Sequence, residues 1–239
     1  MKDLIDKILK ETNYQNNPYF TFLLDGSFDK EDFIETQIQF YFAVVFFNRP
    51  MSALAAKIPS PDLRMEVLRN VWEEHGEGNI SLSHGSSFLE FLQQMGNISS
   101  KDVSKRALWP EVRAFNTCLS GACILDDFII GVGAMGMIER MFCDISSIIG
   151  SGIIQRKWLT EKELIHYNVH AELDIKHSED FFNILEESWN KNDENRYFIE
   201  QGLRLGASIF NNLYKGLYES RNKRMDRLWQ GRHSKSDCV

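Results

Sequence analysis

The chain has 239 residues, 43% of them hydrophobic, and a formal net charge of −7 at pH 7. The acidic balance argues against a nucleic-acid-binding surface, and no stretch approaches the roughly 18 uninterrupted apolar residues that a membrane span needs. The first residues lack the apolar segment of a signal peptide, so we expect a cytoplasmic protein with neither a membrane nor a nucleic-acid partner.

Breakers and capping residues divide the chain into helices. After a first helix over residues 3–12 and a short apolar segment between Pro18 and Gly26, Asp29 is expected to cap a long helix to Phe47. The sequence Asn48-Arg49-Pro50 is expected to kink or restart that helix. The remaining predicted helices cover residues 61–77, 85–95, 101–119, 122–149, 160–188 and 193–222.

Several of these boundaries have specific signals. Ser60-Pro61 reads as a cap followed by proline at the first helical position, and Thr160 with Glu163 reads as a capping box. Gly150 and Gly152 are expected to separate two helices. Low proline content and the lack of alternating apolar and polar runs disfavour strands. We therefore predict a single all-α domain of seven or eight main helices over residues 1–222.

Residues 223–239 form a basic, polar C-terminal tail in this interpretation. We expect the tail to be frayed or disordered, or to pack on a partner chain. The four cysteines, Cys118, Cys123, Cys143 and Cys238, form neither a closely spaced metal-binding pair nor a disulfide framework. Reduced thiols are therefore expected.

One segment carries the strongest chemical signal. His170, Asp174 and His177 follow the spacing i, i+4 and i+7, which places them on one stripe of a helix. Imidazoles and a carboxylate on one stripe are a metal-ligand arrangement. The alternative is a solvated polar face of the helix, on which the two histidines share one stripe by chance.

Two weaker signals lie upstream. Glu77 and His84 are separated by two helical turns or by a break at Gly78, and an acidic helix end near a loop histidine is commonplace. Glu139 is a lone carboxylate in an apolar helix, where it could be a ligand or could pair with Arg140 or a neighbouring helix.

Together the three segments supply three carboxylates and three imidazoles without a thiolate. Such a set suits iron or manganese, and two ions rather than one. Ferritin-like di-iron bundles use two Glu-x-x-His motifs, whereas this chain has only Glu163-Leu-Ile-His166. That family is therefore not supported.

From about Tyr19 to Phe182 the chain resembles the heme-oxygenase-like di-iron oxidases. These belong to a superfamily with the TenA thiamine-salvage proteins, the oxidase PqqC and the chlamydial p-aminobenzoate-forming protein CADD. The markers are Glu-x6-His at Glu77, the lone Glu139, and His-x3-Asp-x2-His at His170. The resemblance implies a heme-oxygenase-like bundle of seven helices, commonly dimeric, that does not bind heme.

The resemblance also implies a ligand set. One iron would be held by Glu77, His84 and His170, and a second, often labile, by Glu139, Asp174 and His177. Members activate O2 and oxidise a small substrate of the fatty-acid, amino-acid or amine type. His166 is a candidate to contact substrate, and Glu73 is a weaker candidate for the pocket wall; we take both as possible catalytic residues.

Three alternatives stay open. Members that form p-aminobenzoate consume a tyrosine and a lysine of their own chain. In this sequence Phe20 and Ile149 align with those two positions, although Tyr19 is adjacent to Phe20. The second alternative is a metal-free enzyme of the same fold, either TenA-like or PqqC-like. A TenA-like hydrolase needs a cysteine nucleophile, for which the chain offers Cys118, Cys123 and Cys143. The third alternative is a non-catalytic protein that binds a partner.

Overall fold

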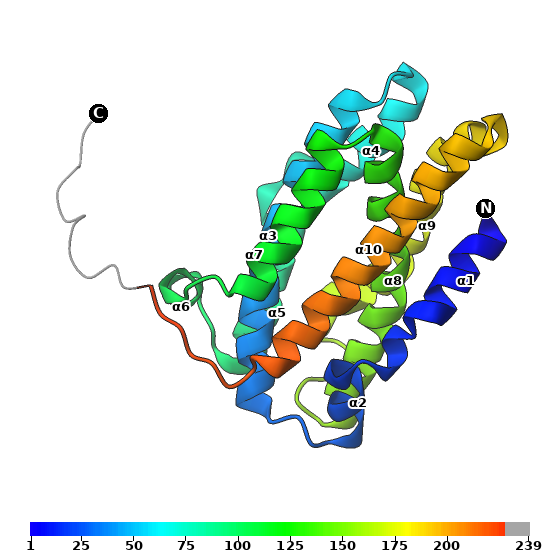
Figure 1. Cartoon of the computed structure of the whole chain (residues 1–239). Coiled ribbons are helices and arrows are strands. Elements are labelled where there is room, and N and C mark those ends of the chain that lie inside the picture. The colour runs from blue at the N-terminus through cyan, green and yellow to red at the C-terminus, as the bar shows by residue number, and fades with distance from the viewer. Residues whose placement is uncertain (228–239) are drawn as a thin grey trace.

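The computed structural model describes residues 1–227, except the side chains of Ile165 and residues 168–174 (Figure 1). The predicted ligands His170 and Asp174 therefore lie outside the described side chains. Residues 228–239, most of the predicted tail, lie outside the described residues as well.

The described residues form ten α-helices, and their only strand-like feature is an isolated bridge between Arg106 and Asp226. The all-α prediction is confirmed. The helices are α1 (Lys2–Thr12), α2 (Pro18–Asp25), α3 (Lys30–Lys57), α4 (Pro61–Glu74), α5 (His84–Gly96), α6 (Ser100–Lys105), α7 (Pro110–Ser120), α8 (Phe128–Gln155), α9 (Ile165–Lys191) and α10 (Asp193–Glu219).

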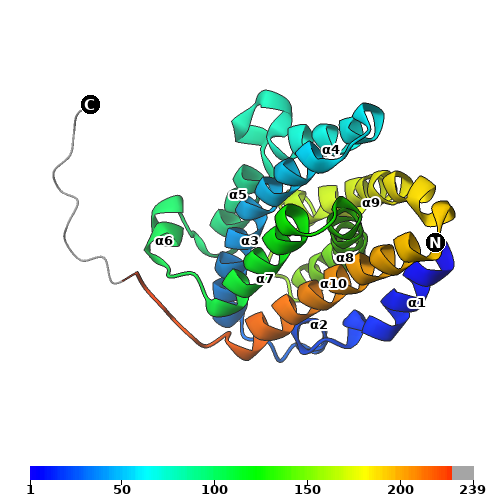
Figure 2. The ribbon, with the colours of Figure 1, turned by 45° about the horizontal axis from the view of Figure 1, so that its top comes forward.

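Helix α8 lies in the middle of the bundle, with α9 on one side and α10 on the other (Figures 1 and 2). It is apolar around most of its circumference, as expected of a central helix. Gly202 and Gly206 of α10 lie against the α8 backbone at Ile130 and Ala134, where a Cβ atom has no room. These glycines allow the two helices to approach closely.

Two predicted helix ends are absent. Helix α3 continues through Pro50 to Lys57, so it does not restart there, and Gly150 and Gly152 lie inside α8. Met51 and Leu54, beyond the proline, are fully buried, and this burial offsets a proline penalty of about 3 kcal/mol. The two glycines are needed for packing, because Leu164 and Leu23 fill the space beside them.

Three predicted boundaries move. The helix expected over 101–119 is divided into α6 and α7, because Pro110 begins a new helix at its first position. Helix α8 begins at Phe128, capped by Asp127, after a π-helical turn over Gly121–Leu125. The Thr160–Glu163 contacts form, but they close a turn that precedes α9 rather than its first turn.

The C-terminal segment up to residue 227 packs on its own chain. The Ala107 and Arg227 amides donate to the Met225 and Lys105 carbonyls, both at 2.7 Å, and Arg224 contacts Asp32 at 2.7 Å. Residues 223–227 of the predicted tail are therefore held against α6 and α3.

None of the described helices is long and apolar enough to cross a membrane.

Candidate functional site

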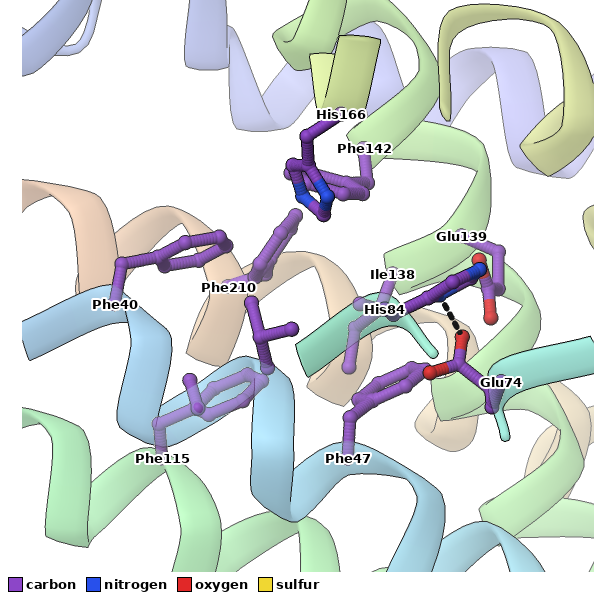
Figure 3. Close-up of a pocket in the computed structure, with 12 residues that line it drawn as sticks. Phe40, Phe47, Glu74, His84, Phe115, Ile138, Glu139, Phe142, His166 and Phe210 are labelled. Carbon is purple, nitrogen blue, oxygen red and sulfur yellow. Dashed lines mark ion pairs between the residues drawn. The ribbon is translucent and has the colours of Figure 1, made fainter. Parts of the chain in front are cut away.

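A cavity of about 50 Å³ lies inside the bundle, between α3, α4, α5, α7, α8, α9 and α10 (Figure 3). Most of its wall is apolar, and it includes five phenylalanines, Phe40, Phe47, Phe115, Phe142 and Phe210. Its polar wall consists of two carboxylates and two imidazoles, Glu74, His84, Glu139 and His166. Four different helices contribute these four side chains.

The closest polar contact in the cavity joins Glu74 and His84. Glu74 Oε1 lies 2.7 Å from His84 Nδ1, with side chains 6% and 12% exposed. Glu74 is the last residue of α4 and His84 the first of α5, where Ser83 accepts a hydrogen bond from the Ser86 amide. The connection between the two helices therefore folds back and places the imidazole on the carboxylate.

Glu139 and His166 complete the polar wall. Glu139 of α8 is 4% exposed, and Figure 3 shows its carboxylate beside the His84 ring. His166, near the start of α9, is 2% exposed; its Nδ1 lies 2.9 Å from Ser87 Oγ. The Phe88 ring packs edge-on at 4.7 Å from the imidazole centroid. His166 is thus held in one orientation by a hydroxyl and an aromatic ring.

A second carboxylate–imidazole pair uses the residue before Glu74. Glu73 Oε2 lies 2.6 Å from Nε2 of His177 in α9, and the side chains are 23% and 2% exposed. Consecutive residues on a helix point about 100° apart. Glu73 and Glu74 therefore reach imidazoles on two different neighbouring helices, α9 and α5.

The structure brings together part of the predicted set. His84, Glu139 and His166 line the cavity, and His177 and Glu73 form the neighbouring pair. Among the side chains that the structure describes, no three His, Cys, Asp or Glu side chains are placed so that they could hold a metal ion.

Glu77 is not brought to the cavity in this structure. Its side chain is exposed, and its backbone has φ 54° between Gly76 and Gly78, whose φ values are 66° and 89°. Three successive left-handed residues turn the chain away as soon as α4 has ended at Glu74. The expectation that Glu77 faces His84 is therefore not met, because the predicted helix ends three residues early.

Sequence reasoning missed Glu74. A signal for it exists, because Val67, Asn70 and Glu74 follow the i, i+3, i+7 spacing of a buried helix face, and all three are buried. A carboxylate at the end of such a stripe points inward, whereas a carboxylate three residues later points inward only if the helix continues.

A buried polar chain anchors the start of α9. The Tyr167 hydroxyl donates to Gln37 Oε1, and Gln37 Nε2 contacts the Tyr19 hydroxyl, which lies 2.8 Å from Thr36 Oγ1. Burial raises the pKa of Tyr167 and Tyr19, so both phenols stay protonated at neutral pH. These bonds tie His166, the neighbour of Tyr167, to α3 and α2.

The cysteine chemistry that a metal-free hydrolase requires is not favoured at Cys123. Burial raises the pKa of this thiol to about 12, so it stays protonated and a poor nucleophile. Cys143 is buried too, and Cys118 is exposed.

Comparison with known proteins identifies the family. The sequence model of the iron-containing redox enzymes matches residues 35–209, and the chain belongs to this family. A curated relative, the 4-aminobenzoate synthase of Chlamydia pneumoniae, is 19% identical over 176 residues, which cover 74% of this chain and 77% of the relative.

Solved structures show the same fold. A TenA homologue from Pseudomonas syringae has a TM-score of 0.75 at 15% identity and covers 91% of this chain and 92% of its own. A CADD-like protein of unknown function from Nostoc punctiforme has a TM-score of 0.73 at 14% identity, covering 92% and 99%. A Shewanella denitrificans domain of unknown function has a TM-score of 0.70 at 15% identity, covering 92% and 89%. The predicted heme-oxygenase-like bundle is confirmed.

Proposed function

We propose that this member of the iron-containing redox enzyme family is a non-heme di-iron oxidase that uses O2 to oxidise a small organic substrate. One observation carries the proposal. Two buried carboxylates and two imidazoles, from four helices, face a cavity whose remaining wall is apolar. Carboxylates and imidazoles in such surroundings are costly to desolvate, so they are found there paired with one another, hydrogen-bonded or holding a metal ion.

The donor chemistry of the cavity fits iron. Carboxylate oxygens and imidazole nitrogens without a thiolate suit iron or manganese. We propose that His84, Glu139 and His177 hold the metal together with Glu77 and the two predicted ligands outside the described side chains, His170 and Asp174. Bound iron would supply the activation of O2.

We assign Glu74 and Glu73 the role of positioning the imidazoles. A metal-binding histidine usually has its second ring nitrogen held by a carboxylate or carbonyl, which fixes the ring orientation. The Glu74 carboxylate lies 2.7 Å from Nδ1 of His84, and the Glu73 carboxylate lies 2.6 Å from Nε2 of His177. His84 would then bind metal through Nε2, and His177 through Nδ1. In this proposal Glu73 is a positioning residue rather than a catalytic one.

Glu77 requires a movement of its turn to become a ligand. The left-handed backbone of a non-glycine residue costs on the order of 1 kcal/mol, and such strain is concentrated at functional sites. Glu77, with φ 54°, is the one non-glycine in the left-handed turn of residues 76–78. We propose that metal binding draws this turn inward, which relieves the strain and adds a carboxylate.

The apolar wall and His166 would serve the substrate. The phenylalanines exclude water from the cavity, which protects reactive species. Ser87 fixes Nδ1 of His166, so the ring presents Nε2 as the atom that would exchange a proton with a bound substrate. A volume of about 50 Å³ suits a small molecule such as O2 or water, so an organic substrate must displace wall side chains.

Iron loading tests the proposal. Metal-free protein is titrated with Fe(II) without oxygen, bound iron is counted, and O2 consumption is then followed with panels of amines, amino acids and fatty acids. We expect two iron ions per chain, the second more weakly bound, and O2 consumption that depends on one substrate class. If the protein binds no iron, or if the metal-free protein turns over a substrate, the result would favour the alternative hypothesis of a metal-free TenA-like or PqqC-like enzyme.

We also propose that the protein is a homodimer. Analytical ultracentrifugation at micromolar concentration should give the mass of two chains. A single species with the mass of one chain would contradict the dimer without affecting the iron proposal.

A further inference from the structure

Asn70, in the second half of α4, is a buried amide without a hydrogen-bond partner. It is 3% exposed, and neither its Nδ2 nor its Oδ1 has a partner within the part of the chain that the structure describes. A buried amide that has lost its hydrogen bonds to water and gained none in their place destabilises the fold. Leucine has a similar size and would occupy the position without this cost. The amide therefore needs an explanation beyond the stability of the metal-free chain.

Helix periodicity places Asn70 one turn below Glu74. The two residues are four positions apart, so they lie about 40° apart around the helix axis, with Cβ atoms about 5–6 Å from each other. Side chains on a helix lean towards its N-terminus, so the Glu74 side chain leans back over the turn that carries Asn70. Both residues are buried on the same face of α4. A side-chain amide and a carboxylate at this spacing can form a hydrogen bond.

Two other carboxylates lie within one turn of Asn70, but both have access to water. Glu66, four positions before it, is 33% exposed and pairs with Arg69 of the same helix. Glu73, three positions after it, is 23% exposed and contacts His177. Glu74 is only 6% exposed, so it depends on protein groups for its hydrogen bonds. Burial therefore favours Glu74 as the acceptor for the Asn70 amide.

The position of Glu74 at the end of its helix explains why a second contact matters. It is the last residue of α4, and the turn of residues 76–78 begins two positions later. If metal binding draws this turn inward, as we propose above, the last turn of α4 would move with it, whereas Asn70 lies one turn deeper in the helix. An amide from that position can hold the Glu74 carboxylate against the His84 ring, which it contacts at 2.7 Å (Figure 3). A carboxylate accepts several hydrogen bonds at once, so the two contacts are compatible.

We propose that Asn70 is a positioning residue of the metal site: in the iron-loaded protein its Nδ2 donates a hydrogen bond to the Glu74 carboxylate, which orients the His84 imidazole. The inference rests on the proposed function and adds to it a residue that contacts no metal. In the metal-free protein the same amide only lowers stability. Its removal should therefore have two effects of opposite sign.

Asn70→Leu tests both effects. Without metal, its melting temperature should lie at least about 2 °C above that of the wild type, because an unpaired buried amide is gone. Its Fe(II) affinity, measured by titration without oxygen, should be about tenfold lower, as for other residues that orient a metal ligand. Asn70→Ala, which introduces no larger side chain, should weaken Fe(II) binding by the same factor. A residue with a packing role alone would not raise stability and lower affinity together.

Two further variants show whether Asn70 acts through Glu74. Asn116→Leu is the matched control: Asn116, in α7, is 8% exposed and its Oδ1 has no partner among the described residues, so the variant should bind Fe(II) like the wild type. The double variant Asn70→Leu/Glu74→Ala should bind Fe(II) no more weakly than Glu74→Ala alone, because the acceptor is already lost.

The outcomes separate this inference from the proposed function. Wild-type Fe(II) affinity in both Asn70 variants, losses that add in the double variant, or a melting temperature of metal-free Asn70→Leu at or below that of the wild type overturns the role of Asn70 and leaves the iron site standing. A wild-type protein that binds no iron refutes the proposed function, and this inference with it.

Discussion

Two regions of the molecule bury carboxylates to the same depth but give them different partners. Glu35 is 2% exposed and contacts the guanidinium groups of Arg106 at 3.1 Å and Arg224 at 3.8 Å. Glu74 is 5% exposed and contacts the His84 imidazole at 2.7 Å. Arginine keeps its charge and cannot bind a metal, whereas a neutral imidazole can. The depth at which a carboxylate is buried therefore does not indicate a metal site, whereas the side chain that it contacts does.

The Glu35 region has a structural role. Arg106 also contacts Asp226 at 2.7 Å, so the network holds the segment up to residue 227 against α3 and α6. Burial raises the pKa of Glu35, and this effect outweighs the two guanidiniums, which lower it. The comparison predicts that changes near Glu35 affect stability, and changes near His84 affect metal binding.

The largest effect is expected at His84. His84→Ala removes an imidazole that we propose as a ligand, so Fe(II) affinity should fall at least about 100-fold while the far-ultraviolet circular dichroism stays that of the wild type. His75→Ala is the matched control, because the His75 ring contacts the Val71 carbonyl of its own helix at 2.7 Å. Wild-type affinity in His84→Ala would remove His84 from the proposed ligand set.

Smaller losses are expected at the two glutamates of the α4–α5 connection. Glu74→Gln should weaken iron binding by about 10- to 100-fold, because a carboxylate that orients a ligand is replaced by an amide. Glu77→Gln should weaken it as well, although the Glu77 side chain is exposed without metal. Equilibrium titration of both variants checks this. Unchanged affinity in Glu77→Gln would show that the turn of residues 76–78 does not move inward.

A modest loss of stability is expected at Tyr167. Tyr167→Phe leaves Gln37 Oε1 buried without the donor it has in the wild type, which should cost about 1 kcal/mol in the free energy of unfolding. Urea denaturation measures it. Tyr197→Phe, at a tyrosine that is 58% exposed, should change nothing. Equal stability of the two variants would show that the buried chain does not anchor α9.

The smallest effect is a difference in pH dependence at Glu35. Its pKa is raised in the folded protein above the ordinary value of 4.5, so between these two values the folded state binds more protons than the unfolded state. This group's contribution to the unfolding free energy therefore falls as pH rises through that window. Glu35→Gln should gain stability relative to the wild type as pH rises above 4.5, with unchanged iron affinity; parallel stability curves would contradict this.

Local signals predicted the helices well. Asp29 accepts hydrogen bonds from the Glu31 and Asp32 amides as an N-cap should, and proline stands at the first position of α4. Breakers were less reliable, because Pro50, Gly150 and Gly152 are tolerated inside helices by packing with distant residues. The sequence around them does not contain that information.

The lining of the candidate cavity could be predicted only in part, because it too depends on contacts between distant residues. His84, Glu139 and His166 were expected at the site, and all three line the cavity. Glu74 was missed because its position depends on where α4 ends, and the left-handed turn at Glu77 was not anticipated. The bond from Tyr167 to Gln37 spans 130 positions of the sequence, so no local pattern could reveal it. Roles for His170 and Asp174 stay predictions.

A crystal structure of the iron-loaded protein, with anomalous diffraction recorded at the iron absorption edge, tests whether the cavity holds iron. We expect anomalous peaks in the cavity, with iron at the roughly 2.0–2.2 Å typical of nitrogen and oxygen ligands from His84 and Glu139. The Glu74–His84 contact should persist beside the metal. Iron bound only at the surface, or a cavity without an anomalous peak in crystals that contain iron, would contradict the proposed metal site.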